Sequence, residues 1–331
     1  MPIWSQILFE ITETQKTSGD NAADVVRRKY IKKLSAHTGR NTILYASKWT
    51  QPSIVPLNPD FISITAGDIQ GLMEVINGLS GDKLDLILHS PGGSAEATES
   101  FVSYLRTKFK DIRVIIPHAA MSAATMLACA SDKILMGKHS FIGPIDPQII
   151  LDTASGLRAI PAQDILTQLS MIEDECKKDP QLLPIYYPML QQYGTALIMQ
   201  CIQAQDLSEE LVCKWLAMFM FKKAGTLDER KTKSKDVAQK LANHDYFKSH
   251  GRFIDRESAR TDFGLEIGDL EADQILQDLV LSVFHATTIT FTQKAAVKII
   301  ENQNDHAFIQ ALQITPVPIQ PPTGTPPAHI P

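Results

Sequence analysis

The chain has 331 residues, 44% hydrophobic and 21% charged, which is an ordinary composition with room for one large domain or two small ones. Its net charge of −5 provides no basic excess to pair with phosphates, which argues against a nucleic-acid-binding protein. The four cysteines have no C-x-x-C spacing and no metal or nucleotide motif occurs, so we expect reduced thiols, no metal, no cofactor and no intrinsic ATPase.

The N-terminal part begins with an amphipathic segment and a helix predicted over 21–35. Residues 1–17 lack the basic region and sustained apolar core of a signal peptide. No stretch reaches the roughly 18 uninterrupted apolar residues that a membrane span needs. We therefore expect a cytoplasmic protein without a transmembrane segment. The pattern next predicts a strand over 42–46, a short strand over 61–65 and a helix over 66–79.

A first polar turn, Ser90-Pro91-Gly92-Gly93, lies between a strand predicted over 84–88 and a helix predicted over 94–108. The strand is an apolar run broken by one Asp, a pattern typical of a buried parallel strand. Two glycines allow a substrate backbone to approach closely, and their N–H groups can hold a developing oxyanion.

A second turn carries Ser122, between a strand predicted over 112–116 and a helix of small residues predicted over 123–130. A hydroxyl in this position lies at the positive end of the helix dipole. Taken alone, a serine before a helix is most often a cap.

Together the two turns resemble those of the Clp-fold serine peptidases, the superfamily of the Clp proteolytic subunit and signal peptide peptidase A. Gly93 and Ser122 are 29 positions apart (122 minus 93), as in the Clp proteolytic subunit. The segment Gly143-Pro144-Ile145-Asp146-Pro147-Gln148 also resembles the branch called serine dehydrogenase proteinases, which are peptidases. The resemblance covers roughly residues 84–148.

This resemblance implies an α/β fold of repeated β-β-α units with a parallel sheet, followed by a mainly helical C-terminal half. Helices are predicted there over 162–176, 189–204, 208–223, 234–241 and 271–285. The expected organisation is an N-terminal segment and helix (1–36), a peptidase domain (37–285), a C-terminal extension (286–313) and a Pro-rich disordered tail (314–331).

By the same resemblance, Ser122 would be the nucleophile. The backbone N–H groups of Gly93 and Ala123 would form the oxyanion hole, and Gly92 would shape the turn. The reaction would be endopeptidase cleavage of a peptide or unfolded protein through an acyl-enzyme. The resemblance also implies a homo-oligomeric ring, and a separate ATPase or adaptor would have to unfold folded substrates.

The group that activates Ser122 is left open by the sequence. Aligned on the Clp proteolytic subunit, Ile145 takes the place of the catalytic histidine. Signal peptide peptidase A uses a lysine, and Lys177 and Lys178 follow Ser122 by 55 and 56 positions, with Lys178 preferred. A lysine base must be partly buried so that its pKa falls. Otherwise these residues form a charged, solvated helix end.

Two histidines are alternatives: His118, four residues before Ser122, and His139, seventeen residues after it. Asp146 would orient whichever base is used, or would only hold its own turn. Two other functions also remain open. One is a crotonase-like acyl-CoA enzyme, which uses two backbone amides without a serine nucleophile, and the other is a non-catalytic scaffold that binds peptides.

Overall fold

The computed structural model describes residues 2–53, 57–153 and 156–312. Its centre is a seven-stranded sheet in the order β10-β5-β3-β2-β1-β11-β12. The first five strands are parallel to one another, and β11 is antiparallel to both of its neighbours, β1 and β12. The strands are β1 (Asn41–Ser47), β2 (Lys83–His89), β3 (Asp111–Ile116), β5 (Lys133–Met136), β10 (Ile267–Asp269), β11 (Ala296–Asn302) and β12 (Ala307–Ala311). This confirms the predicted α/β fold with a mainly parallel sheet.

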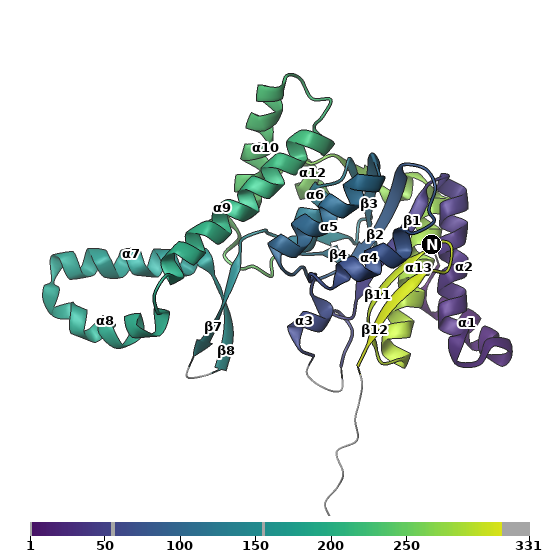
Figure 1. Cartoon of the computed structure of the whole chain (residues 1–331), viewed down its shortest axis with the longest axis horizontal. Coiled ribbons are helices and arrows are strands. Elements are labelled where there is room, and N and C mark those ends of the chain that lie inside the picture. The colour runs from purple at the N-terminus through teal and green to yellow at the C-terminus, as the bar shows by residue number, and fades with distance from the viewer. Residues whose placement is uncertain (1, 54–56, 154–155, 313–331) are drawn as a thin grey trace, which may run out of the picture.

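Helices cover both faces of the sheet (Figure 1). They are α1 (Trp4–Ser18), α2 (Ala22–Thr38) and α13 (Gln274–Gln293) on one side, and α4 (Asp68–Ile76), α5 (Ala95–Lys108) and α6 (Ala123–Cys129) on the other. Successive side chains of a strand point to opposite faces. Leu86 of β2 therefore enters the core under α4, α5 and α6, while Ile87 enters the core under α2 and α13.

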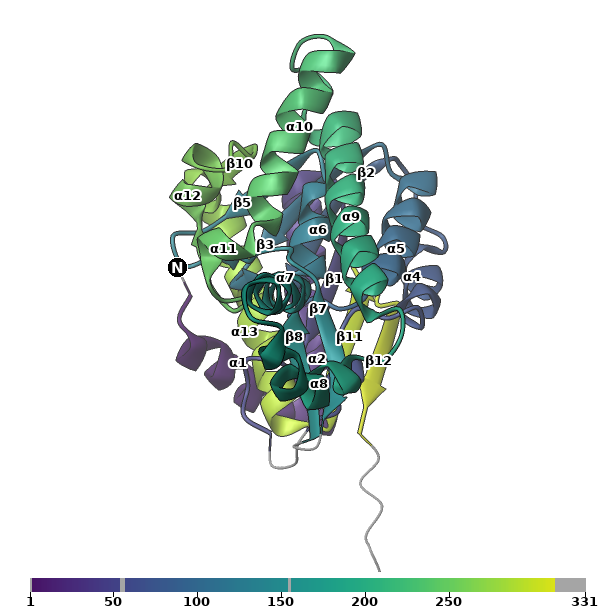
Figure 2. The same ribbon diagram turned by 90° about the vertical axis from the view of Figure 1, so that its left-hand side faces the viewer.

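An arm projects from this body (Figures 1 and 2). It consists of the hairpin β7 (Gln148–Thr153) and β8 (Gly156–Pro161), and of α7 (Ala162–Lys178), α8 (Leu183–Leu190) and the first part of α9 (Leu197–Trp215). The arm has a small core of its own, formed by Ala162, Ile165, Leu197 and Cys201. Beyond α9 lie a π-helical turn (Leu216–Met220), α10 (Leu227–Ala242), α11 (His244–Phe247) and α12 (Arg256–Thr261).

Several elements differ from the sequence prediction. The short strand predicted over 61–65 is wrong, because Asn58 caps a helix, α3 (Pro59–Ile62), and only Ile64 then forms an isolated bridge. The helix predicted over 189–204 spans a break, since α8 ends at Leu190 and α9 begins at Leu197. The residues expected as a C-terminal extension supply the end of α13 and the strands β11 and β12, while the predicted tail (314–331) lies outside the described residues.

Helix α13 is long and apolar enough to cross a membrane when judged only by length and composition. In the fold, 67% of its most apolar 18-residue window is buried, and the helix packs against α2. Such burial is typical of the core helix of a folded domain. The expected absence of a transmembrane segment stays a prediction.

Candidate active site

Ser122 occupies a strained turn between β4 (Ala119–Ala120) and α6. Its backbone has φ 52° and ψ −123°, and the N–H of Ala124 donates to the carbonyl of Met121 at 2.9 Å. These values match the first central position of a type II′ turn, which favours glycine. Ser122 is the N-cap residue of α6, but its side chain makes no capping hydrogen bond, so the interpretation of its hydroxyl as a helix cap is wrong. Strain of about 1–3 kcal/mol is thus kept at a residue whose hydroxyl is not used for capping.

The glycine turn packs directly against this serine. Gly92 has φ 106°, and a Cβ atom placed there would lie 2.7 Å from the Met121 carbonyl oxygen and 2.9 Å from the Ala123 nitrogen. A Cβ atom at Gly93 would collide with the backbone of Ile64. Both positions therefore require glycine, and the fold brings together two turns that lie about thirty residues apart in sequence.

The neighbouring segment around Ile64 supports the glycine turn. The N–H of Ile64 donates to the Gly92 carbonyl at 2.7 Å, and the Ile64 carbonyl accepts from the Ser94 N–H at 3.1 Å. The hydroxyl of Ser94 in turn caps α5 by accepting from the Ala97 N–H at 3.0 Å. The turn is thus fixed on both sides.

A buried ion pair supports the Ile64 segment. Lys298 of β11 donates to the Ser63 carbonyl at 2.6 Å and to the Asp68 carboxylate at 2.7 Å, and both charged side chains are fully buried. The other oxygen of Asp68 accepts from the Thr65 N–H at 3.0 Å and from the Tyr45 hydroxyl at 2.7 Å. Burial first, and then the charge of Asp68, raise the pKa of Tyr45 well above its usual range, which keeps its phenol protonated as a donor.

Near Ser122, the backbone N–H groups of Gly93 and Ala123 are among those that have no acceptor in the described part of the chain. Ala123 is the first residue of α6, where helical N–H groups have no intrahelical partner. Donors of this kind are suited to hold a negatively charged oxygen that forms next to Ser122.

Ser122 opens into a pocket of about 300 Å³. Its walls come from the two turns, from the segment after β6 (Phe141–Ile142), from β7 and from α9. The lining residues are Gly93, Ser94, Ala95, Glu96, Ser122, Ala123, Met126, Ile145, Pro147, Gln148, Ile149, Ala204, Leu207 and Ser208. Glu96 is the ionisable residue in this set, and the hydrogen bond from the Ser94 hydroxyl lowers its pKa. No lysine or histidine lines the pocket as described.

The predicted lysine bases do not meet Ser122 within one chain. Lys177 and Lys178 are the last two residues of α7, and this helix runs outward to the far end of the arm (Figure 1). Lys177 is exposed and lies 2.7 Å from Glu173. The hydrogen bond and charge of Glu173 raise the pKa of Lys177, which is opposite to the shift that a lysine base needs.

The two predicted histidine bases also lie outside the pocket lining. The ring of His118 lies 5.5 Å from that of His89 and 5.9 Å from that of Phe284, between centroids. Burial first, and then the charge of His139, lower the pKa of His118. His139 is in the turn after β5, beside Gly137.

Asp146 has two histidine partners that the sequence analysis did not find. Its buried carboxylate lies 2.8 Å from the Nδ1 atom of His244 and 2.8 Å from the Nδ1 atom of His250. The Nε2 atom of His244 lies 3.3 Å from Asp164. No sequence signal could have joined these residues, because about a hundred positions separate Asp146 from each histidine and no motif has that spacing.

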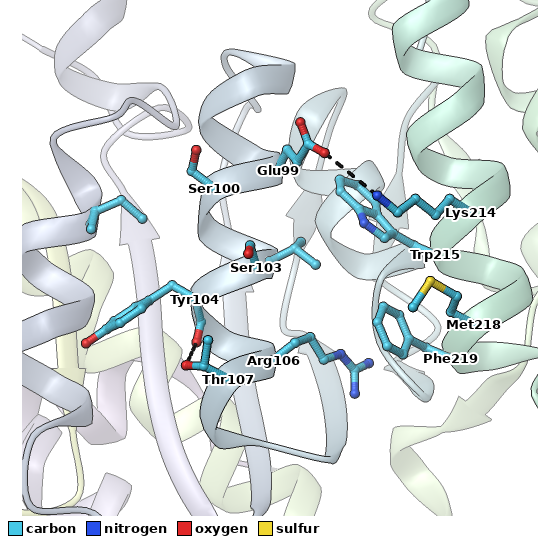
Figure 3. A pocket seen from close by; sticks show the side chains of 12 residues that line it. Glu99, Ser100, Ser103, Tyr104, Arg106, Thr107, Lys214, Trp215, Met218 and Phe219 are labelled. Atoms are coloured by element: carbon cyan, nitrogen blue, oxygen red, sulfur yellow. Dashed lines mark hydrogen bonds and ion pairs between the residues drawn. The ribbon is translucent and has the colours of Figure 1, made fainter.

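A larger groove lies elsewhere, between α5, α9 and the π-helical turn (Figure 3). Its volume is about 780 Å³, and it shares no lining residue with the Ser122 pocket. Trp215, Met218 and Phe219 line it, and the Arg106 guanidinium lies 3.7 Å from the centre of the Phe219 ring. Charged side chains, Glu99, Arg106 and Lys214, lie beside these apolar ones, and the groove is separate from Ser122.

The site thus consists of a serine in a strained strand-to-helix turn that packs against the glycine turn after β2. The chain belongs to the family described as ClpP-like SDH-type serine proteinases, whose model matches residues 3–178 and so includes both turns. It is therefore a Clp-fold protein of a serine peptidase family.

Two uncharacterized proteins of Methanocaldococcus jannaschii are similar in sequence. One is 35% identical over 127 residues, which cover 38% of this chain and 44% of that protein. The other is 40% identical over 92 residues, which cover 28% of this chain and 32% of that protein. The chain thus spans less than half the length of these curated relatives.

Two solved structures show a weaker likeness. ClpP1 from Listeria monocytogenes matches 73% of this chain and 94% of its own, at 13% identity and a TM-score of 0.34. A mutant of the membrane-bound stomatin-specific protease 1510-N matches 62% of this chain and 74% of its own, at 13% identity and a TM-score of 0.34.

Proposed function

We propose that the chain is a serine endopeptidase that cleaves peptide bonds through an acyl-enzyme on Ser122. The observation that carries this proposal is the strained II′ turn, which holds a serine without a capping bond against Gly92. A residue kept in such a backbone conformation is a candidate for chemistry, because a relaxed cap would be more stable. Membership of a serine proteinase family supports the same role.

In this mechanism the Ser122 oxygen attacks the peptide carbonyl while its proton passes to a base. The N–H groups of Gly93 and Ala123 then donate to the oxyanion, and each such donor is worth about 3 kcal/mol to the transition state. The base returns the proton to the leaving amine, which leaves an ester on Ser122. Water attacks this ester by the same route and releases the acid.

Lys178 or Lys177 can serve as the base only if the arm of a second copy brings it to the pocket. The arm carries exposed apolar side chains, Met171, Leu183, Ile185 and Tyr187, which favour association with another surface. We therefore include a homo-oligomer in the proposal. The expected cytoplasmic location and the expected substrates, peptides or unfolded proteins, are also part of it. A separate ATPase or adaptor would unfold larger substrates.

The test is intact-mass labelling of the full chain with a fluorophosphonate, beside Ser122→Ala. We expect one adduct on the wild type and none on Ser122→Ala. A folded wild type that takes no label contradicts the peptidase proposal and favours a peptide-binding scaffold. If Ser122→Ala processes an acyl-CoA thioester, a crotonase-like acyl-CoA enzyme replaces the peptidase as the proposed function.

A further inference from the structure

The pocket beside Ser122 contains a carboxylate that the proposed chemistry does not use. Glu96, in the first turn of α5, lines this pocket and is exposed to solvent. The hydroxyl of Ser94 donates to the Glu96 carboxylate at 2.6 Å, and this hydrogen bond lowers its pKa, so the group is ionised at neutral pH. In the part of the chain that the structure describes, no lysine, arginine or histidine forms an ion pair with Glu96.

Helix α9 forms the wall that faces Glu96. One turn further along α5, Glu99 lies 4.0 Å from Lys214 of α9. Residues three apart on a helix are neighbours on one face, so Glu96 and Glu99 both point toward α9. Leu207, seven residues before Lys214 (214 minus 207), lies on the matching face of α9. Glu99 therefore meets a cation, whereas the residues that α9 contributes to the pocket around Glu96 are uncharged: Ala204, Leu207 and Ser208.

The other walls of the pocket are largely apolar, with Met126, Ile145 and Leu207 among them. Lysine and arginine side chains match such a site, because their methylene groups pack on apolar walls while the charged end reaches a carboxylate at the rim. An acidic side chain in the same place would be repelled by Glu96. The pocket volume of about 300 Å³ is at the small end of the range for ligand pockets, which suits a single substrate side chain.

We propose that Glu96 makes the enzyme selective for substrates that carry a lysine or arginine beside the scissile bond. The inference rests on the proposed peptidase function and names its substrate class. Ser122, Gly93 and Ala123 line the same pocket as Glu96, so the side chain that enters it belongs to a residue close to the bond that is attacked. The substrate thus supplies the cation that the chain itself does not bring to Glu96.

The position of Glu96 in the first turn of α5 also suits a purely structural role. A carboxylate there stabilises the positive end of the helix dipole. A residue with this role alone would change the stability of the protein when it is replaced, and it would leave the choice between charged and uncharged substrates unaltered. Substrate selectivity, compared within one variant, therefore separates the two roles.

The experiment measures kcat/KM of the full chain on internally quenched, alanine-rich peptides. Each peptide carries one lysine, norleucine or glutamate at a position next to the scissile bond, and mass spectrometry maps the cleavage site. Norleucine has the aliphatic stem of lysine without its charge. The wild type should cleave the lysine peptide about fivefold faster than the norleucine peptide, as expected for a partly exposed ion pair. This ratio should fall in about 1 M NaCl, because salt screens the pair.

Three variants test the contribution of Glu96. In Glu96→Gln, which keeps the shape of the side chain, the ratio of lysine to norleucine cleavage should fall to about one. In Glu96→Lys the order should reverse, so that the glutamate peptide is cleaved faster than the lysine peptide. Glu99→Gln is the matched control, because Glu99 lies on the same helix, pairs with Lys214 and is outside the pocket, and it should keep the wild-type ratio.

Labelling of Ser122 with an uncharged fluorophosphonate separates this inference from the peptidase proposal itself. A wild type that labels and cleaves the lysine and norleucine peptides equally well overturns the role of Glu96 and leaves the peptidase standing. The same conclusion follows if Glu96→Gln keeps the wild-type ratio. A wild type that neither labels nor cleaves any peptide overturns both proposals. If Glu96→Gln loses its fold, the reversed preference of Glu96→Lys supports the inference, and an unreversed preference overturns it.

Discussion

Replacing Ser122 by glycine should stabilise the fold while removing the nucleophile. The φ of 52° and ψ of −123° at this position are unfavourable for any residue with a Cβ atom, at a cost of about 1–3 kcal/mol. Ser122→Ala keeps the Cβ atom and loses no capping bond, so its stability should equal that of the wild type.

The magnitude follows from two opposing effects. Glycine removes the strain but gives the unfolded chain more freedom, which costs about 0.5–1 kcal/mol. Ser122→Gly should therefore exceed Ser122→Ala in free energy of unfolding by about 1 kcal/mol. Ala124→Gly, two residues further on and inside α6, is the matched control, and it should be destabilising by about 1 kcal/mol or more because its helical backbone does not need glycine.

Equilibrium unfolding in urea, followed by circular dichroism, measures these differences. The midpoint of Ser122→Gly should lie a few tenths of a molar above that of Ser122→Ala, with the slope unchanged. Equal midpoints for the two variants would refute the reasoning, because Ser122 would then carry no strain and the turn would give no reason to assign it a chemical role.

Three further predictions concern the surroundings of Ser122 and the pH dependence of the fold. Gly92→Ala should abolish fluorophosphonate labelling and lower the midpoint of urea unfolding, because the added Cβ atom would lie under 3 Å from the Met121 and Ala123 backbone. Normal labelling of this variant would contradict the close packing of the two turns. Lys298→Met should destabilise by about 3–5 kcal/mol in urea unfolding, because it leaves Asp68 buried without its cation, whereas the double variant Lys298→Met with Asp68→Asn should recover part of this loss. Burial raises the pKa of Asp132, but the Ile112 N–H, Lys222 and Arg106 lower it further than burial raises it. Its stabilisation should therefore be complete above the unfolded pKa of 3.8 and lost as the pH falls through the lower folded pKa. The unfolding free energies of the wild type and Asp132→Asn should therefore differ at pH 7 and approach each other as the pH falls below 3.8.

The sheet and the two turns could be predicted because their signals are local. Apolar runs such as 84–88 and 112–116 predict buried strands, and the strands β2 and β3 contain them. The paired glycines of the first turn are required by backbone contacts that no other residue satisfies. The strain at Ser122 could not be predicted, because a serine before a helix is ordinarily a cap, and only the backbone angles separate the two cases.

The remaining features depend on partners that are distant in sequence. β11 contains Lys298, Glu301 and Asn302, all fully buried, so its sequence does not read as an apolar strand. Their partners lie more than 200 residues away, at Asp68, Arg27 and Val75. His244 and His250 were missed for the same reason, since their importance comes from one shared contact with Asp146.

The position of Lys298 has a consequence for the order in which the chain matures. Both turns of the site are complete by residue 125, yet the cation that supports the Ile64 segment is on β11, close to the end of the described chain. During synthesis the ribosome releases the two turns long before it releases this strand. We therefore expect a nascent chain, or one truncated before Ala296, to contain Ser122 and both glycines and still be unable to hydrolyse neighbouring polypeptides.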